Sequence, residues 1–266
     1  MRQFKGFFFD LDGTIYAGTK LLDGAMELLD TLQRAEKSIA FMTNNSTLNA
    51  ATIARKLQSF GIHADQDQII CPTDLAGSYL TEKYGRSRVY TIGSEHLTRS
   101  VLVENHSLSE GVDDPCDIVL VGRDLDFTYQ KLEDAVLHLQ RGAKLVATNL
   151  DFHHPIDTGE YVPETGAIVA AIQKTVHTDA EVIGKPASFI FHKGLERFGL
   201  LPHQTVIIGD NPMTDIRGGR KAGLSTILLR DHAREIPEDI VFDQKYQNLL
   251  ELGQDLYGIG VKEDRL

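Results

Sequence analysis

Short apolar runs alternate along the chain with segments whose apolar residues recur every three or four positions. In the first third the apolar runs are residues 6–11 and 38–42, and runs of this length are typical of strands buried on both faces. Two segments have helical spacing, with Ala25, Leu28, Leu29 and Leu32 in one and Ile53, Leu57 and Phe60 in the other. Ser46 or Thr47 is the expected N-cap of the second helix, and Gly61 is its expected end. This alternation predicts a parallel sheet covered by helices.

The last third repeats the alternation, and we expect its strands in the same sheet as those of the first third. The apolar runs here are residues 181–184, 205–209 and 225–229. Pro186 suits the first turn of a helix that follows the first of these runs. A short helix before Gly223 and a closing helix around Leu249 complete this part.

A third alternating block lies between these two. Its apolar runs are residues 88–92, 117–121 and 144–147. A helix that ends at Gly142 separates the last two runs. We therefore predict an α/β fold with a doubly wound, Rossmann-like parallel-sheet core of residues 1–78 and 181–266, into which a smaller α/β domain of residues 79–180 is inserted. The length of 266 residues fits one or two domains.

Composition and charge narrow the class of protein. Hydrophobic residues make up 42% of the chain and charged residues 24%, which excludes disordered and fibrous proteins. The formal net charge of −11 argues against general binding to nucleic acid or to an anionic membrane. Two cysteines are too few for a disulfide framework, and no apolar run is long enough for a signal peptide or a membrane span. We therefore expect a cytoplasmic protein.

Two acidic residues follow the first predicted strand. Asp10 and Asp12 are two residues apart, so both side chains can face one pocket as the strand ends. Two carboxylates this close repel each other unless a cation or a proton lies between them. Taken alone, the Asp12-Gly13 sequence fits an ordinary solvated turn as well as it fits a ligand-binding pocket.

The second predicted strand ends in residues suited to an anion. Thr43, Asn44 and Asn45 follow this strand and precede a helix. Their hydroxyl and amide groups, with the N–H groups of the helix N-terminus, make an anion site. A simple helix cap would need only one such residue.

Two more strand ends carry charged residues. Lys185 follows the run at 181–184, and a lysine there can neutralise a phosphoryl group or a carboxylate. Asp210 follows the most apolar run of the chain, where it is placed to ligate a hard cation, with Asn211 and Asp215 as supporting residues. All four strand ends lie at the sheet edge where open α/β sheets bind ligands.

These four groups resemble, in order, the four motifs of the haloacid dehalogenase superfamily. They are Asp10-Leu11-Asp12-Gly13-Thr14, Thr43-Asn44-Asn45, Gly184-Lys185-Pro186, and Gly209-Asp210 with Thr214-Asp215. Only 33 residues separate the first two motifs, whereas 142 separate the second from the third, which leaves room for a cap domain there. Together with the Thr148-Asn149 pair, this placement resembles the NagD / p-nitrophenyl phosphatase branch. The chain departs from that branch at Leu150 and Glu164, where Pro and Gly are common.

The resemblance implies a magnesium-dependent phosphomonoester hydrolase that acts on a small phosphorylated metabolite, such as a sugar phosphate or a nucleotide. In the family's mechanism Asp10 is the nucleophile that forms an aspartyl phosphate, and Asp12 is the general acid and base. Magnesium is held by Asp10, Asp12 (through its backbone carbonyl) and Asp210. Lys185 offsets the negative charge. The residues that bind the phosphoryl oxygens are Thr43, Asn44 and Asn45.

Two alternatives remain open at this point. A phosphotransferase or phosphomutase would use the same intermediate but pass the phosphoryl group to another acceptor. A non-catalytic phospho-acceptor module, such as a receiver domain, also places acids, a hydroxyl and a lysine at strand ends, but it has no room for an insertion of ~100 residues. The expected partner is a small-molecule phosphate ester, and the cap offers a surface for a homodimer.

Overall fold

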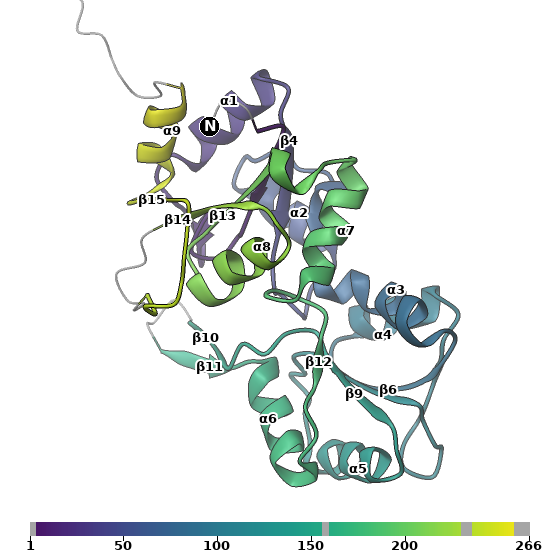
Figure 1. Ribbon diagram of the computed structural model, residues 1–266. Helices are drawn as coiled ribbons and strands as arrows, with labels where there is room; N and C mark the ends of the chain where they lie inside the picture. Colours follow the sequence, from purple (N-terminus) through teal and green to yellow (C-terminus); the bar gives the residue numbers. More distant parts are fainter. Residues whose placement is uncertain (1–3, 156–159, 230–235, 258–266) are drawn as a thin grey trace, which may run out of the picture. The chain divides into compact units, whose positions relative to one another are not determined.

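The chain divides into two compact units (Figure 1), and the computed structural model describes residues 4–155, 160–229 and 236–257. The first unit comprises Met1–Thr43, Ala54–Ile70 and Lys185–Leu266. The second comprises Asn44–Ile53 and Cys71–Gly184. Each unit is built around its own parallel sheet.

The first unit contains a six-stranded sheet with the order β15-β14-β13-β1-β4-β5. Its strands are β1 (Gly6–Phe9), β4 (Ser38–Met42), β5 (Ile69–Ile70), β13 (Thr205–Gly209), β14 (Ser225–Leu229) and β15 (Gln244–Tyr246). All neighbouring strands are parallel. The chain moves outward from β1 in one direction and from β13 in the other, which is the topology of a doubly wound sheet. This confirms the predicted fold class.

Helices cover both faces of the first sheet. They are α1 (Ala25–Arg34), α2 (Ala50–Ser59), α7 (Ser188–Phe198), α8 (Arg217–Lys221) and α9 (Leu249–Tyr257), with the short turns η1 (Gln66–Gln68), η2 (Pro202–Gln204) and η3 (Pro212–Ile216). Right-handed crossovers place α1 and α8 on opposite faces, because the strands they connect progress in opposite directions. Helix α9 packs on α1, and α7 packs on α8 (Figure 1). The Phe7, Phe8 and Phe9 side chains of β1 are therefore completely buried.

The second unit contains a five-stranded sheet with the order β12-β9-β8-β6-β7. Its strands are β6 (Arg88–Ile92), β7 (Ser107–Leu108), β8 (Ile118–Val121), β9 (Lys144–Ala147) and β12 (Glu181–Val182). All of them are parallel to their neighbours. Helices α5 (Tyr129–Gln140) and α6 (Thr165–Val176) pack against each other, and their apolar residues, among them Ala135 and Val169, share one core with those of β6, β8 and β9.

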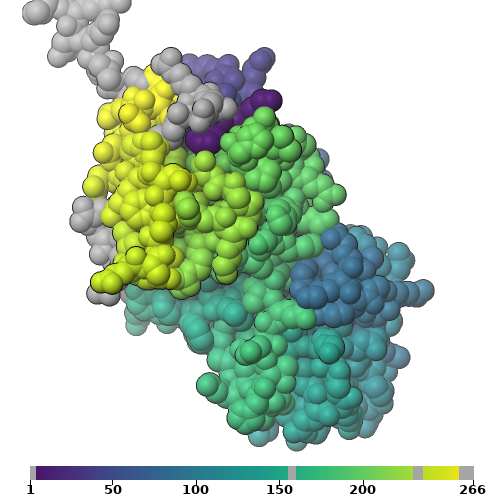
Figure 2. Space-filling model, in the orientation of Figure 1, coloured from purple at the N-terminus to yellow at the C-terminus, as the bar shows by residue number. Residues whose placement is uncertain are grey.

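Helices α3 (Pro72–Tyr84) and α4 (Glu95–Val103) pack closely in the second unit. A Cβ atom added at Gly77 would lie 2.1 Å from the Ser100 carbonyl oxygen, so only glycine allows this approach. Figure 2 shows these helices, in blue, on the surface of their unit.

Each unit also contains an antiparallel hairpin. In the first unit it pairs β2 (Tyr16–Ala17) with β3 (Lys20–Leu21). In the second it pairs β10 (His153–Pro155) with β11 (Tyr161–Pro163). Within the part of the chain that the structure describes, no helix combines the length and the apolar character needed to cross a bilayer.

Three local expectations are wrong. The strand expected at 181–184 in the first sheet is only two residues long, and it pairs with β9 of the second sheet. Helix α2 begins at Ala50, and its cap is the Asn49 side chain, which accepts the Thr52 N–H at 3.0 Å, rather than that of Ser46 or Thr47. Helix α7 begins at Ser188, so Pro186 lies in the preceding turn instead of the first helical turn.

Candidate active site

Three polar residues end neighbouring strands at the carboxyl edge of the first sheet. Asp10 follows β1, Thr43 follows β4 and Asp210 follows β13, and each is less than a tenth exposed. Sheet hydrogen bonds extend beyond the strands, because the Asp10 N–H donates to the Ile208 carbonyl (2.9 Å) and the Thr43 N–H donates to the Ile70 carbonyl (3.1 Å). The sheet therefore fixes the backbone from which the Asp10 and Thr43 side chains start.

Lys185 reaches this edge from the turn before α7. Its ammonium donates hydrogen bonds to Asp10 Oδ1 (2.5 Å), to Asp215 Oδ1 (2.6 Å) and to the Met42 carbonyl (3.0 Å). Burial by itself lowers the pKa of a lysine, but the charges of Asp10 and Asp215 outweigh it here and raise the pKa of Lys185. The side chain, 2% exposed, therefore stays charged between the two carboxylates.

Asp215 is held in η3 by a second set of contacts. Its Oδ2 accepts the Asn211 N–H at 3.0 Å, and the Asn211 side chain accepts the Met213 N–H at 2.9 Å. A Cβ atom at Gly209 would lie 2.2 Å from Asp215 Oδ2, so a side chain at that position would displace the carboxylate. These contacts keep the Asp215 carboxylate beside Lys185.

Asp10, Asp210 and Asp215 form a buried acidic cluster in which one carboxylate oxygen of each residue lies within 4.8 Å of those of the other two. Burial raises the pKa of Asp10 well above its ordinary value; Lys185 opposes this shift, while the charges of Asp215 and Asp210 add to it. A divalent cation would relieve this repulsion, and oxygen ligands suit Mg²⁺. The donor set therefore fits magnesium, with two of the three predicted ligands in the cluster and the Asp12 backbone carbonyl as the third.

Gly13 leaves room for the Asp210 carboxylate. Its φ is +86°, a backbone conformation that favours glycine. A Cβ atom at this position would lie 2.6 Å from Asp210 Oδ2. Glycine is therefore required here both by the turn and by the neighbouring carboxylate.

Asp12 lies in the turn between β1 and the β2–β3 hairpin and is partly exposed. It forms a β-bridge with Tyr16, and burial, followed by the charges of Asp12 and Asp10, raises the pKa of the Tyr16 hydroxyl. Tyr16 lies outside the four motifs and is not among the predicted site residues. The signal that could have found it is the Asp-Gly turn, which folds the following residues back onto Asp12.

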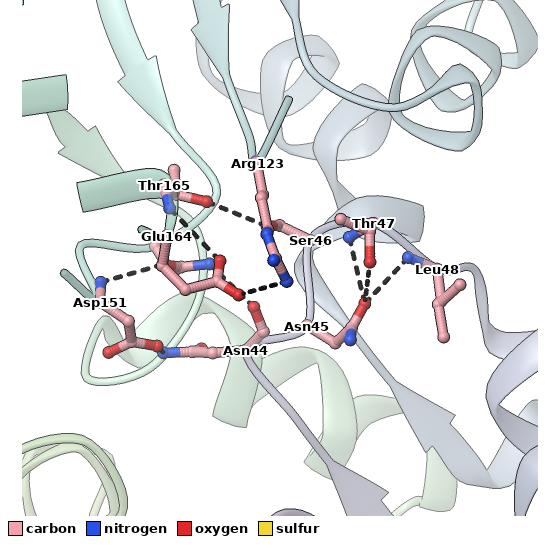
Figure 3. A network of polar contacts seen from close by, with 10 residues as sticks. Asn44, Asn45, Ser46, Thr47, Leu48, Arg123, Asp151, Glu164 and Thr165 are labelled. Atoms are coloured by element: carbon pink, nitrogen blue, oxygen red, sulfur yellow. Dashed lines mark hydrogen bonds and ion pairs between the residues drawn. The ribbon is translucent and has the colours of Figure 1, made fainter. Parts of the chain in front are cut away.

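Asn44 and Asn45 belong to the second unit, and both are held by hydrogen bonds within it (Figure 3). The Asn44 amide donates to Asp151 Oδ2 at 3.0 Å. The Asn45 Oδ1 accepts the N–H groups of Thr47 (3.1 Å) and Leu48 (2.9 Å), which closes an Asx turn. The orientation of both amides is therefore set before any ligand binds.

An ion pair in the same network joins two strand ends of the second unit. The Arg123 guanidinium donates to Glu164 Oε1 at 3.0 Å, and both side chains are largely buried. Burial raises the pKa of Glu164, and Arg123 partly offsets the shift. Ser46 Oγ lies 2.9 Å from Thr165 Oγ1 and accepts the Arg123 N–H at 3.1 Å. Neither Arg123 nor Thr165 is among the predicted site residues, although Arg123 closely follows the apolar strand β8 (Ile118–Val121).

Family models and known proteins match this fold and these motifs. The model described as haloacid dehalogenase-like hydrolase matches residues 7–105, and a HAD-hydrolase-like model matches residues 182–240. The chain is 33% identical over 227 residues to an acid sugar phosphatase of Staphylococcus epidermidis, which covers 85% of this chain and 86% of the relative. It is 32% identical over 229 residues to a 5'-nucleotidase of Bacillus subtilis, with 86% and 88% covered.

Solved structures agree with these matches. The crystal structure of 4-nitrophenylphosphatase from Thermotoga maritima superposes with a TM-score of 0.87 at 30% identity and covers 96% of this chain and 98% of that one. The fold and the site define a hydrolase with an α/β core and a second α/β unit. The chain belongs to the haloacid dehalogenase-like hydrolases and, within them, to the NagD-like phosphatases.

Proposed function

We propose that this phosphatase is a magnesium-dependent phosphomonoester hydrolase that acts through an aspartyl phosphate at Asp10. The observation that carries the proposal is the geometry around Lys185, whose buried ammonium binds both Asp10 and Asp215. This ion pair holds a carboxylate oxygen in place and supplies positive charge where the phosphoryl group would arrive. Phosphoryl transfer needs mainly positioning and charge stabilisation, so this small set of residues is sufficient.

The reaction proceeds in two displacements at phosphorus. In the first, a carboxylate oxygen of Asp10 bonds to phosphorus, the ester P–O bond breaks, and Asp12 gives a proton to the leaving alcohol. In the second, water attacks the aspartyl phosphate and Asp12 takes the proton from that water. Inorganic phosphate leaves, and Asp10 returns as a carboxylate.

Asp10 and Asp210, with the Asp12 carbonyl, would hold the magnesium ion. When bound, the ion supplies charge that keeps Asp10 ionised and balances the phosphoryl oxygens. We assign the binding of those oxygens to Thr43, Asn44 and Asn45. The buried position of Thr43 at the end of β4 and the fixed amide of Asn44 support this assignment.

The two parts of the chain have different proposed roles. We assign residues 1–78 and 181–266 to the catalytic core and 79–180 to a cap that selects the substrate. The substrates are small phosphate esters. Sugar phosphates and nucleotides are the first to test, because one relative is an acid sugar phosphatase and another a 5'-nucleotidase.

We further propose a cytoplasmic enzyme, consistent with its two cysteines, and a homodimer formed through the cap.

Hydrolysis of p-nitrophenyl phosphate tests the proposed reaction. We expect turnover by the wild-type protein with Mg²⁺, and none with EDTA or after Asp10→Asn. Asp30→Asn, which changes an exposed aspartate on α1, is the matched control and should leave the rate unchanged. Turnover that persists in EDTA would refute the metal requirement, and full activity of Asp10→Asn would refute the nucleophile.

A further inference from the structure

The Arg123–Glu164 ion pair of the second unit uses only part of the hydrogen-bonding capacity of its guanidinium. Arg123 Nη1 donates to Glu164 Oε1 at 3.0 Å. Nε is buried, and neither it nor Nη2 has a hydrogen-bond partner among the residues that the structure describes. The two side chains are 22% and 15% exposed, so part of the pair can be reached from solvent. The guanidinium therefore has donors left for an incoming oxygen atom.

Both members of the pair are anchored by further hydrogen bonds. The Arg123 N–H donates to Ser46 Oγ at 3.1 Å. Glu164 is the N-cap of α6, where its Oε2 accepts the Thr165 N–H at 3.3 Å. Ser46 Oγ lies 2.9 Å from Thr165 Oγ1, which links the two anchors. The pair is therefore in place before a ligand binds, and binding loses little side-chain freedom.

The segments that carry the ion pair also hold Asn44, to which the proposed function assigns the binding of a phosphoryl oxygen (Figure 3). The Asn44 amide donates to Asp151 Oδ2 at 3.0 Å. The Asp151 carbonyl in turn accepts the N–H of Gly166, two residues after Glu164, at 2.9 Å. A phosphate ester whose phosphoryl group is bound by Asn44 can therefore extend its alcohol part to the ion pair.

The charges around the pair favour an uncharged group of the substrate over a second anion. With histidine neutral at pH 7, the single guanidinium of Arg123 stands against two carboxylates, because the charge of Asp151 also acts on Glu164. His154 acts in the opposite direction when it is protonated. A substrate carboxylate or second phosphate would meet this net negative charge. A hydroxyl group avoids the repulsion, since it can accept from the guanidinium and donate to a carboxylate oxygen.

We propose that Arg123 and Glu164 determine specificity by binding hydroxyl groups on the alcohol part of the substrate, so that the enzyme prefers phosphate esters of polyols. This inference rests on the proposed function, which supplies the role of Asn44. It deepens that function, because it names two residues that select the substrate and the chemical group that they bind. Glu164 is also a position at which the chain departs from the branch that it resembles.

Two phosphate esters of similar size test this preference. Glucose 6-phosphate carries hydroxyl groups on a six-membered ring, whereas cyclohexylmethyl phosphate has a bare ring, and both release a primary alcohol. We expect the wild-type kcat/KM to be ~10-fold or more higher for glucose 6-phosphate. The carboxylate-bearing ester 2-phosphoglycolate should be a poorer substrate than glucose 6-phosphate.

The double variant Arg123→Met/Glu164→Gln removes both charges together, so that neither is left buried without its partner. Gln keeps an acceptor for the Thr165 N–H. We expect this variant to lower kcat/KM for glucose 6-phosphate by ~10-fold or more, chiefly through KM, and to leave cyclohexylmethyl phosphate and p-nitrophenyl phosphate nearly unaffected. Arg88→Met/Asp114→Asn is the matched control, since it removes another ion pair of the second unit and should change none of the three.

Hydrolysis of p-nitrophenyl phosphate separates failure of this inference from failure of the proposed function. If the wild type hydrolyses it but does not prefer glucose 6-phosphate to the bare ring, the inference is wrong. It is also wrong if the double variant keeps that preference or slows all three esters equally, or if 2-phosphoglycolate is the better substrate. If the wild type with Mg²⁺ does not hydrolyse p-nitrophenyl phosphate, the proposed function itself is overturned.

Discussion

Lys185 lies between Asp10 and Asp215 with 2% of its side chain exposed. Removing one partner of a buried ion pair leaves an uncompensated charge, which costs about 3–5 kcal/mol. Lys185→Ala should therefore lower the free energy of unfolding by about 3 kcal/mol and reduce kcat by ~100-fold or more. Urea unfolding and steady-state kinetics measure the two effects.

The matched control for this prediction is Lys193→Ala. Lys193 pairs with Glu196 at 3.0 Å on the surface of α7, where Glu196 is 71% exposed. Such exposed pairs contribute under about 1 kcal/mol. Equal losses of stability in the two variants would mean that the Lys185 ion pair is not a special feature of this site.

Gly13 offers a test of the metal site that leaves every charged residue in place. Gly13→Ala would place a Cβ atom 2.6 Å from Asp210 Oδ2 and so move a proposed ligand. We expect the Mg²⁺ concentration for half-maximal activity to rise ~10-fold or more. Gly85→Ala, also at positive φ (+71°) but with no heavy atom within 4 Å, should destabilise the fold without changing the Mg²⁺ requirement. If Gly85→Ala also raises the Mg²⁺ concentration for half-maximal activity, the effect of Gly13→Ala comes from backbone strain and not from the displaced Asp210 carboxylate.

Helix α5 contributes a buried histidine to the core of the second unit. His138 is 1% exposed, and its ring lies 5.1 Å from that of Tyr90. Burial lowers the pKa of His138; Asp134 and Asp114 act against this shift, and Arg141 adds to it. The unfolded chain therefore binds a proton at a higher pH than the folded one, so stability is lost as the pH falls below about 6.5.

His138→Leu should reduce this pH dependence. We expect the difference in unfolding free energy between about pH 7.5 and about pH 5.5 to be smaller in the variant than in the wild type. Urea unfolding followed by circular dichroism at both pH values measures it. His192→Gln, an exposed position on α7, is the control and should behave as the wild type. If the difference in unfolding free energy between the two pH values is as large in His138→Leu as in the wild type, His138 is not the source of this pH dependence.

The elements that the sequence predicts well are those whose signal is local. β1, β4, β13 and β14 are continuous apolar runs, and each is a buried strand of the first sheet. The two-residue strand β12 resembles them in sequence, but its partner is β9 of the other sheet. Strand pairing joins residues far apart in the chain, and no local pattern encodes it.

Residues 149–167 show a different limit of sequence reasoning. Polar and glycine residues there favour a loop, yet the chain forms β10, β11 and the start of α6. The hairpin is short, and Tyr161 is 63% exposed, so the alternation that marks a half-buried strand is absent. The two strands contact each other through cross-strand pairs, such as the His153 ring on the Tyr161 ring with centroids 4.5 Å apart.

At the scale of the whole molecule, the motif order predicts which residues of distant stretches lie together at the proposed active site. Asp10, Lys185, Asp210 and Asp215 come from three separate stretches of sequence, and the first unit brings them together. The second unit was harder to delimit, because it includes Asn44–Ile53. Those residues join it through long-range contacts such as that of Ser46 with Thr165, 119 positions away.

The phosphorylated form of Asp10 is the species that tests the central claim most directly. Wild-type protein turning over p-nitrophenyl phosphate with Mg²⁺ would be quenched in acid, digested and analysed by mass spectrometry. The account predicts one phosphoryl group on the peptide that contains Asp10, which disappears once substrate is exhausted and never forms in Asp10→Asn. A phosphoryl group that persists after substrate is gone would indicate a phospho-acceptor module. Sustained phosphate release with Asp10 unmodified would contradict the mechanism.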